Sequence, residues 1–259
     1  MSGRPVVRIS GAAGPPLMLT ESRSMTTSSE PALFDPIAGL YQRYAEITDG
    51  VFRPWLDRNL PDRADRAADL GCGSGRWSVL LAGRATDVLA VDISDIELSL
   101  ARTSRARANV SYERRSLLDV TPARDGLFDL VVSVNTLFHL HGEHGVDPVL
   151  AHVRSLVAPG GRALLIDVVS PGPRSPLHHR WWGVTDAART LGRGRSVADA
   201  WAVFRLRQHP TWMRHARTNH PLTRPRFHDA YSRHFPGATF TDDLDPFTCA
   251  ASWQAPMRH

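Results

Sequence analysis

The chain has 259 residues, a formal net charge of +5 and an apolar content of 42%. A chain of this length can bury one substantial core, and it favours one large domain over two. No apolar run reaches 18 residues, which argues against a membrane-spanning helix.

Basic and acidic residues are distributed unevenly along the chain. All 31 basic residues are arginine, and from Ser170 onward 13 arginines face six aspartates and no glutamate. Eight of the 12 histidines lie in the same part of the chain. Such a basic segment suits an acidic substrate or RNA, although a solvated arginine surface is the simpler interpretation.

The two cysteines, Cys72 and Cys249, are not placed as in a disulfide scaffold or a zinc site. No cluster of histidines and acids has the spacing of a metal site either, so we expect no metal requirement. This cysteine usage fits a reducing cytoplasm, and we expect a cytoplasmic protein.

Residues 1–30 are rich in Ser, Thr, Gly and Pro, and we expect a disordered N-terminal tail followed by one domain over residues 31–259. Asp35 and Pro36 suit the cap and first turn of a helix running toward Leu60. Gly50 and Pro54 are candidate breaks within it.

Alternating strands and helices follow from Arg66 to Val169, which predicts right-handed crossovers and a parallel sheet. The expected strands lie at residues 67–70, 88–92, 110–112, 128–134 and 163–169. The runs at 128–134 and 163–169 are nearly unbroken apolar segments, as expected of strands that are buried on both faces.

The first of these strands ends in the segment Asp-Leu-Gly-Cys-Gly-Ser-Gly at residues 69–75, and a helix is expected from about Trp77. Glycines allow φ > 0 and a close backbone approach to a ligand, and the N–H groups of a first helical turn attract an anion. A dinucleotide fingerprint is excluded because position 76 is Arg, and a P-loop is excluded because the chain has no lysine. The remaining pattern, acid-x-Gly-x-Gly-x-Gly, resembles the first motif of class I S-adenosylmethionine-dependent methyltransferases.

Three later features strengthen this resemblance. Asp92 ends the second strand 21 residues after Gly71, where an acid can accept hydrogen bonds from both ribose hydroxyls. Asp119 stands where the family's acid meets the adenine amino group. Residues 156–161, Leu-Val-Ala-Pro-Gly-Gly, resemble the family's Leu-x-Pro-Gly-Gly before a further strand.

The resemblance covers about residues 34–253 and implies an α/β, Rossmann-like fold. It predicts a mostly parallel seven-stranded sheet with helices on both faces and a closing antiparallel β-hairpin. We assign the hairpin to residues 237–241 and 246–253, after a helix at 222–235. The excess residues, about 171–221, are expected to form a helical cap insertion, with helices at 177–190 and 196–207.

The implied cofactor is S-adenosyl-L-methionine, the methyl donor. Tyr44 lies in a segment that resembles the one with which relatives cover the donor, and Asp69 is expected to order the glycine turn and reach the methionine amino group. The predicted cofactor-binding residues are Tyr44, Asp69, Gly71, Cys72, Gly73, Gly75, Asp92, Ile93, Leu118, Asp119 and Asn135.

The segment that follows the strand at 128–134 is expected to lie beside the transferable methyl group. Asn135-Thr136-Leu137-Phe138 departs from the Asn/Asp-Pro-Pro-Tyr/Phe of relatives that methylate nucleobases or glutamine. His139 is the first candidate for a general base and His141 the second. The predicted substrate-binding residues are Phe138, His178, Trp181 and Trp182.

These patterns favour methyl transfer to oxygen or nitrogen of a small organic acceptor in secondary metabolism, by a monomer or homodimer with no membrane or nucleic-acid partner. Two alternatives stay open. One is an RNA or protein methyltransferase that uses the basic C-terminal third, and the other is a binding protein that keeps the donor pocket without methyl transfer.

Overall fold

The computed structural model describes residues 37–170, 176–219 and 221–257. The predicted disordered tail at residues 1–30 and the predicted helix start at Asp35 and Pro36 lie outside these ranges. So does part of the expected cap insertion, at residues 171–175 and 220.

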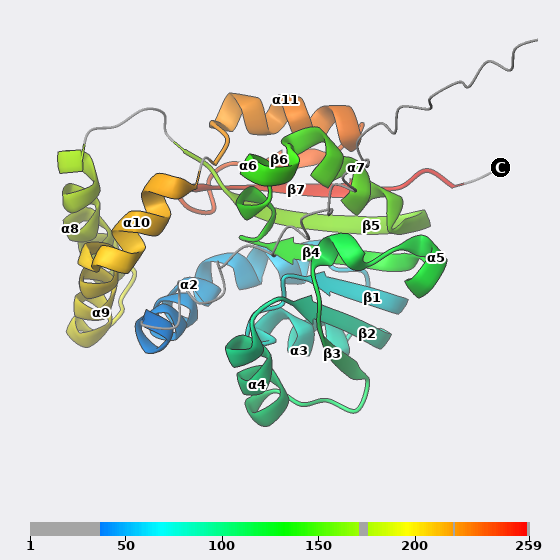
Figure 1. Cartoon of the computed structure of the whole chain (residues 1–259), viewed down its shortest axis with the longest axis horizontal. Coiled ribbons are helices and arrows are strands. Elements are labelled where there is room, and N and C mark those ends of the chain that lie inside the picture. Colours follow the sequence, from blue (N-terminus) through cyan, green and yellow to red (C-terminus); the bar gives the residue numbers. More distant parts are fainter. Residues whose placement is uncertain (1–36, 171–175, 220, 258–259) are drawn as a thin grey trace, which may run out of the picture.

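The described residues form a seven-stranded sheet in the order β3–β2–β1–β4–β5–β7–β6 (Figure 1). The first five strands are parallel, whereas β7 pairs antiparallel with both β5 and β6. The strands are β1 Ala64–Leu70, β2 Ala85–Asp92, β3 Val110–Arg114, β4 Phe128–Val134, β5 Val157–Val168, β6 Thr239–Thr241 and β7 Thr248–Gln254. The predicted fold class is therefore confirmed, including the closing hairpin.

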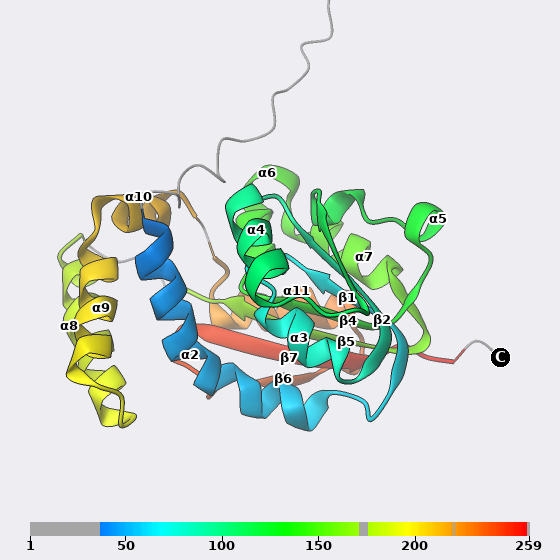
Figure 2. The same cartoon turned by 90° about the horizontal axis from the view of Figure 1, so that it is seen from below.

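Helices cover both faces of the sheet (Figures 1 and 2). Apolar side chains of α2 Ala38–Asn59 and α3 Arg76–Ala82 pack on one face with Ala67, Val88 and Ile166. Leu98 of α4 Asp95–Ser104 packs nearby, against Ala90. The other face is covered by α7 Val146–Ser155 and α11 Arg224–His234. Short connecting helices complete the core: η2 Leu117–Asp119, α5 Pro122–Asp125, η3 Leu137–His139 and α6 His141–His144.

Three further helices, here called the cap helices, stand together beside the first half of α2 at one end of the molecule (Figures 1 and 2). They are α8 Pro176–Gly192, α9 Val197–Gln208 and α10 Pro210–Thr218. They follow β5, so they enter the fold from the carboxyl end of that strand. That these helices cover an acceptor pocket stays a prediction.

Two local expectations differ from the structure. The helix α2 continues through Gly50 and Pro54 to Asn59. Pro54 removes one backbone donor, but burial of Phe52, Trp55 and Leu56 against the sheet offsets that cost. The strand β5 begins at Val157 rather than at residue 163, so it includes the Pro-Gly-Gly segment at 159–161. Its pairing with β4 has an irregular register between Phe128 and Leu130.

Candidate active site

The strand order places β1 between β2 and β4, so the chain adds β2 and β3 on one side of β1 and then crosses back to add β4 on the other side. In open parallel sheets, ligands bind beyond the carboxyl ends of the strands at such a point. The glycine turn after β1, Asp92 at the end of β2 and Asn135 after β4 all lie there. The topology thus brings the predicted donor-binding residues of three strands to one sheet edge.

The three glycines of the turn all have positive φ, at 78° for Gly71, 50° for Gly73 and 78° for Gly75. A Cβ at Gly71 would lie 2.2 Å from the Thr136 side chain, and one at Gly75 would lie 2.5 Å from the Tyr112 hydroxyl. These two glycines are therefore required by the protein's own packing. Gly73 has more room, with the Glu97 carboxylate 3.6 Å from its ideal Cβ position, and it is the glycine that best suits ligand approach.

Asp92 holds the glycine turn through its own carboxylate. One oxygen accepts a hydrogen bond from the Gly73 N–H and the other from the Ser94 N–H, each at 2.8 Å. Burial raises the pKa of Asp92, while these backbone donors act in the opposite direction. A carboxylate offers about four lone-pair sites, so two remain for the hydroxyls of a ribose.

Asp69 and Asn135 carry buried oxygen atoms that lack a hydrogen-bond partner among the described residues. Asp69 accepts a hydrogen bond from the Ser78 hydroxyl at 2.6 Å through Oδ2, whereas its Oδ1 has none. Burial raises the pKa of Asp69 to about 7. Asn135 adopts a φ of 54° and leaves its Oδ1 without a partner. Buried acceptors of this kind fit an ammonium donor such as the amino group of a methionine moiety.

The remaining residues that are predicted to contact the methyl donor differ in their solvent exposure. Cys72 is buried against Ala90 and Leu98, and burial raises the pKa of its thiol. Ile93 is 41% exposed beside Asp92. Leu118 and Asp119 lie in η2 after β3, with Leu118 half-buried and Asp119 exposed. Their contacts with a donor stay predictions.

Gln42 and Glu97 add a contact that sequence reasoning missed. The Gln42 amide donates to both Glu97 carboxylate oxygens, at 2.8 and 2.6 Å, and so links α2 to α4 beside Gly73. The two residues are 55 positions apart, and no local pattern in the sequence connects them.

The predicted acceptor segment contains two histidines in different environments. The His139 ring lies on the Phe138 ring with centroids 3.9 Å apart, and it is half-buried. The His141 ring is buried, and neither of its nitrogens has a hydrogen-bond partner among the described residues. Burial lowers the pKa of His141 to about 4, which makes it a poor proton acceptor.

A buried aspartate anchors this segment. Asp167, at the end of β5, accepts hydrogen bonds from the Tyr231 hydroxyl at 3.2 Å and from the backbone of Val168 and Phe138. Burial raises the pKa of Asp167 to about 8. Nothing in the sequence distinguished this acid from other acids at strand ends.

Tyr44 contacts the cap helices. Its hydroxyl accepts a hydrogen bond from Arg207 of α9 at 2.8 Å, and the guanidinium lies over the Tyr44 and Trp212 rings at 4.9 and 5.0 Å. Arg207 also pairs with Asp186 of α8 at 2.8 Å. Tyr44 therefore joins α2 to the cap, and a further contact with the donor stays a prediction.

The two predicted substrate-binding tryptophans, which are neighbours in α8, have different environments. Trp182 packs against Phe247 with ring centroids 5.2 Å apart, whereas Trp181 is 66% exposed. His178 lies in α8, but its side chain is outside the described part of the structure. That Phe138, His178, Trp181 and Trp182 contact an acceptor stays a prediction.

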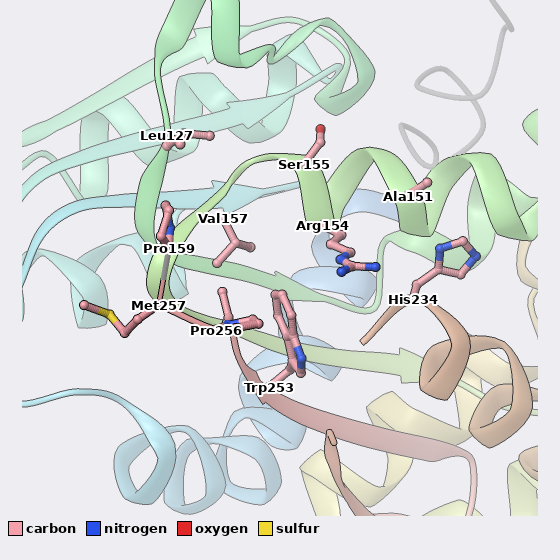
Figure 3. Close-up of a pocket in the computed structure, with 11 residues that line it drawn as sticks. Leu127, Ala151, Arg154, Ser155, Val157, Pro159, His234, Trp253, Pro256 and Met257 are labelled. Carbon is pink, nitrogen blue, oxygen red and sulfur yellow. The ribbon is translucent and has the colours of Figure 1, made fainter. Parts of the chain in front are cut away.

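A groove of about 550 Å³ lies at the opposite edge of the sheet, near the starts of β4 and β5 (Figure 3). The Arg154 guanidinium lies over the Trp253 ring at 5.8 Å in its wall, and Pro159 and Met257 also line it. This groove is separate from the donor-binding edge, because it is formed at the amino ends of the parallel strands.

Comparisons with known proteins bear directly on this site. A family model described as "Methyltransferase domain" matches residues 67–161, the part that contains the glycine turn, Asp92 and Asn135. An uncharacterized methyltransferase of Mycobacterium bovis is 31% identical over 140 residues, covering 53% of this chain and 69% of that protein. The chain belongs to the S-adenosylmethionine-dependent methyltransferases.

Other relatives of the methyltransferase are named ubiquinone biosynthesis O-methyltransferase. The one from Aromatoleum aromaticum is 29% identical over 152 residues, covering 53% of this chain and 62% of that protein. The one from Thiobacillus denitrificans is 34% identical over 111 residues, covering 41% of this chain and 46% of that protein. The chain thus spans 62% of the length of the first of these relatives and 46% of the second, less than two thirds of either.

Solved structures agree on the fold of the methyltransferase. A TehB-like SAM-dependent methyltransferase from Corynebacterium glutamicum superposes with a TM-score of 0.53 at 16% identity, covering 87% of this chain and 99% of that one. A DhpI–SAH complex gives a TM-score of 0.51 at 20% identity, covering 90% of this chain and all of that one.

Across the described residues, no helix combines the length and apolar character needed to cross a membrane.

Proposed function

We propose that this methyltransferase transfers the methyl group of S-adenosylmethionine to an oxygen or nitrogen atom of a small organic acceptor. The observation that carries the proposal is the convergence of Asp69, Asp92 and Asn135 beyond the carboxyl ends of three adjacent strands. The O-methyltransferase names of two relatives support the class of reaction, although each match covers only part of those proteins.

In this proposal the donor supplies a methyl group on a sulfonium, which is already a good electrophile. Asp92 holds the ribose hydroxyls, and Asp69 and Asn135 receive the methionine amino group through their unpartnered oxygens. Asp119 holds the adenine amino group. Holding the reacting atoms in line supplies several kcal/mol of the acceleration.

The acceptor is placed by the segment after β4. His139 removes the proton that a phenol or hydroxyl acceptor must lose, and Phe138 packs on its ring. Asp167 fixes the backbone of Phe138, so it is a positioning residue rather than a catalytic one. An amine acceptor enters as its free base and needs no such proton transfer.

The test is transfer of labelled methyl from S-adenosylmethionine to a panel of phenols, catechols and amines, with bulk tRNA and a protein extract as separate arms. The proposal expects label in at least one small-molecule class and none in the macromolecular arms. Label found only in tRNA or protein would contradict the acceptor class. Donor binding without label in any arm would favour the non-methylating alternative.

A further inference from the structure

A cluster of three potential metal ligands lies away from the donor site, between α11 and the β6–β7 hairpin (Figure 1). It consists of His228 of α11, Asp242 just after β6, and Cys249 of β7. One ligand atom from each residue lies within 4.8 Å of the other two. The residues are spread from position 228 to position 249, which is why no sequence spacing revealed them.

Both hydrogen-bond contacts within the cluster involve the same oxygen atom, Asp242 Oδ1. His228 Nε2 lies 2.9 Å from Asp242 Oδ1, and the Cys249 thiol donates to the same oxygen at 3.1 Å. A nucleophilic cysteine needs the histidine as its base, but here the aspartate stands between the two. Burial and the hydrogen bond to Asp242 also raise the pKa of the Cys249 thiol to about 12, so the arrangement does not activate a thiolate.

The three ligand atoms suit a transition metal instead. Imidazole nitrogen, carboxylate oxygen and thiolate sulfur are the ligand types of tetrahedral zinc, at about 2.0–2.3 Å from the ion. Such ligands lie about 3.5 Å from one another around a tetrahedral ion. The two hydrogen-bonded contacts, at 2.9 and 3.1 Å, need to open by well under 1 Å, and the His228 and Cys249 ligand atoms already lie within 4.8 Å of each other. The His228 ring is already held by stacking on Phe240, with centroids 4.4 Å apart.

The solvent exposure of the cluster and the charges around it are also compatible with a bound divalent cation. The Cys249 side chain is buried, but the His228 and Asp242 side chains are 35% and 40% exposed, so an ion can reach two of the three ligands from solvent. A divalent ion would balance the negative charges of the carboxylate and the thiolate. The Arg224 guanidinium, with Nε 4.0 Å from Asp242 Oδ1, adds one positive charge that moderates the affinity.

We propose that His228 Nε2, Asp242 Oδ1 and Cys249 Sγ form a binding site for one zinc-like divalent cation, with a fourth position open to water. Binding replaces the thiol S–H bond by a metal–sulfur bond, and the released proton leaves to solvent. The ion links α11 to the β6–β7 hairpin through its protein ligands. It lies outside the methyl-transfer site, so it takes no part in methyl transfer.

The experiment is titration of the reduced, tag-free chain with Co²⁺ as a spectroscopic probe, followed by displacement with Zn²⁺. The proposal expects one Co²⁺ per chain, a thiolate-to-cobalt charge-transfer band and intense visible bands of a four-coordinate ion. Zinc should abolish both and raise the melting temperature, because an ion that binds only the folded state stabilises it.

Matched variants locate the site. C249S should lose the charge-transfer band, and H228Q should weaken cobalt binding by at least about tenfold. H234Q is the control, since His234 also lies on α11 and also pairs with an aspartate, at 2.8 Å from Asp147. Absence of the band in the unmodified chain, or its persistence in C249S, would overturn the proposal, and neither result depends on methyltransferase activity.

Discussion

At the scale of single residues, two histidines that are two positions apart have opposite suitability as a base. His141 is buried without a hydrogen-bond partner among the described residues, and burial holds its pKa at about 4. His139 is half-buried and lies on the Phe138 ring, next to the backbone that Asp167 anchors. Environment therefore favours His139 as the group that takes a proton from the acceptor.

Replacing His139 by Asn tests this assignment. With a phenol or hydroxyl acceptor, kcat should fall by about 10²-fold or more, because the general base is lost while the donor contacts remain. Donor affinity should stay unchanged. The control is His144→Asn, which alters an exposed histidine in the same segment. Equal kcat for the two variants on a hydroxyl acceptor would refute the role of His139 as a base.

At the scale of elements, α2 lies between the cap helices and the donor-binding loops. Tyr44 joins it to α9 through Arg207, and Gln42 joins it to α4 through Glu97. Arg207 is half-buried and pairs with Asp186 as well as with the Tyr44 hydroxyl. These contacts make α2 the element through which movement of the cap would reach the glycine turn.

Replacing Arg207 by Leu should loosen the cap, because the Tyr44 hydroxyl loses its guanidinium partner and Asp186 keeps its pair with Arg189 but loses the one with Arg207. Removing one partner of a buried charge pair costs about 3 kcal/mol. Hydrogen exchange should accelerate in α8, α9 and α10 and much less in the sheet. Arg205→Leu, an exposed arginine of the same helix, is the control, and identical exchange in the two variants would refute the role of Arg207.

The sequence predicts an element of this fold when the signal for it is local, and fails when the signal comes from tertiary contacts. The buried parallel strands and the glycine turn were predictable because apolar runs and Gly-x-Gly spacing are local signals. The continuous α2 was not, because tertiary burial of Trp55 and Leu56 overrides the local signal of Pro54. The helix at Pro210–Thr218 was also not predicted. The contacts of Arg207 with Tyr44, and of Gln42 with Glu97, join distant positions that no pattern links.

At the scale of the whole molecule, burial of two sheet aspartates ties folding stability to pH. Burial raises the pKa of Asp69 to about 7 and that of Asp167 to about 8, both far above the value of an aspartate in the unfolded chain. The folded state therefore binds these protons more tightly than the unfolded state does. Their contribution to stability is fully present below about pH 4 and is lost as the pH rises through about 7 and 8.

The substitution Asp167→Asn separates this effect from other titrations. Relative to the variant, the unfolding free energy of the unmodified chain should fall by about 1.4 kcal/mol per pH unit between about pH 4 and pH 8. The reason is that Asn stays neutral in both states. Chemical denaturation at several pH values measures the difference, and parallel curves for the two proteins would contradict the buried, protonated state of Asp167.

The central claim for the whole molecule is that the sheet edge at Gly71, Asp92 and Asn135 binds S-adenosylmethionine. Asp87 provides a matched control, because it lies on β2 with Asp92 but toward the other end of the strand, where it is exposed. Calorimetric titration with S-adenosylmethionine or S-adenosylhomocysteine compares the unmodified chain with Asp92→Ala and Asp87→Ala.

We expect one site per chain, a loss of about 2–3 kcal/mol of binding free energy in Asp92→Ala and no loss in Asp87→Ala. A chain that binds neither compound, or an Asp92→Ala variant that binds as tightly as the unmodified chain, would contradict the account.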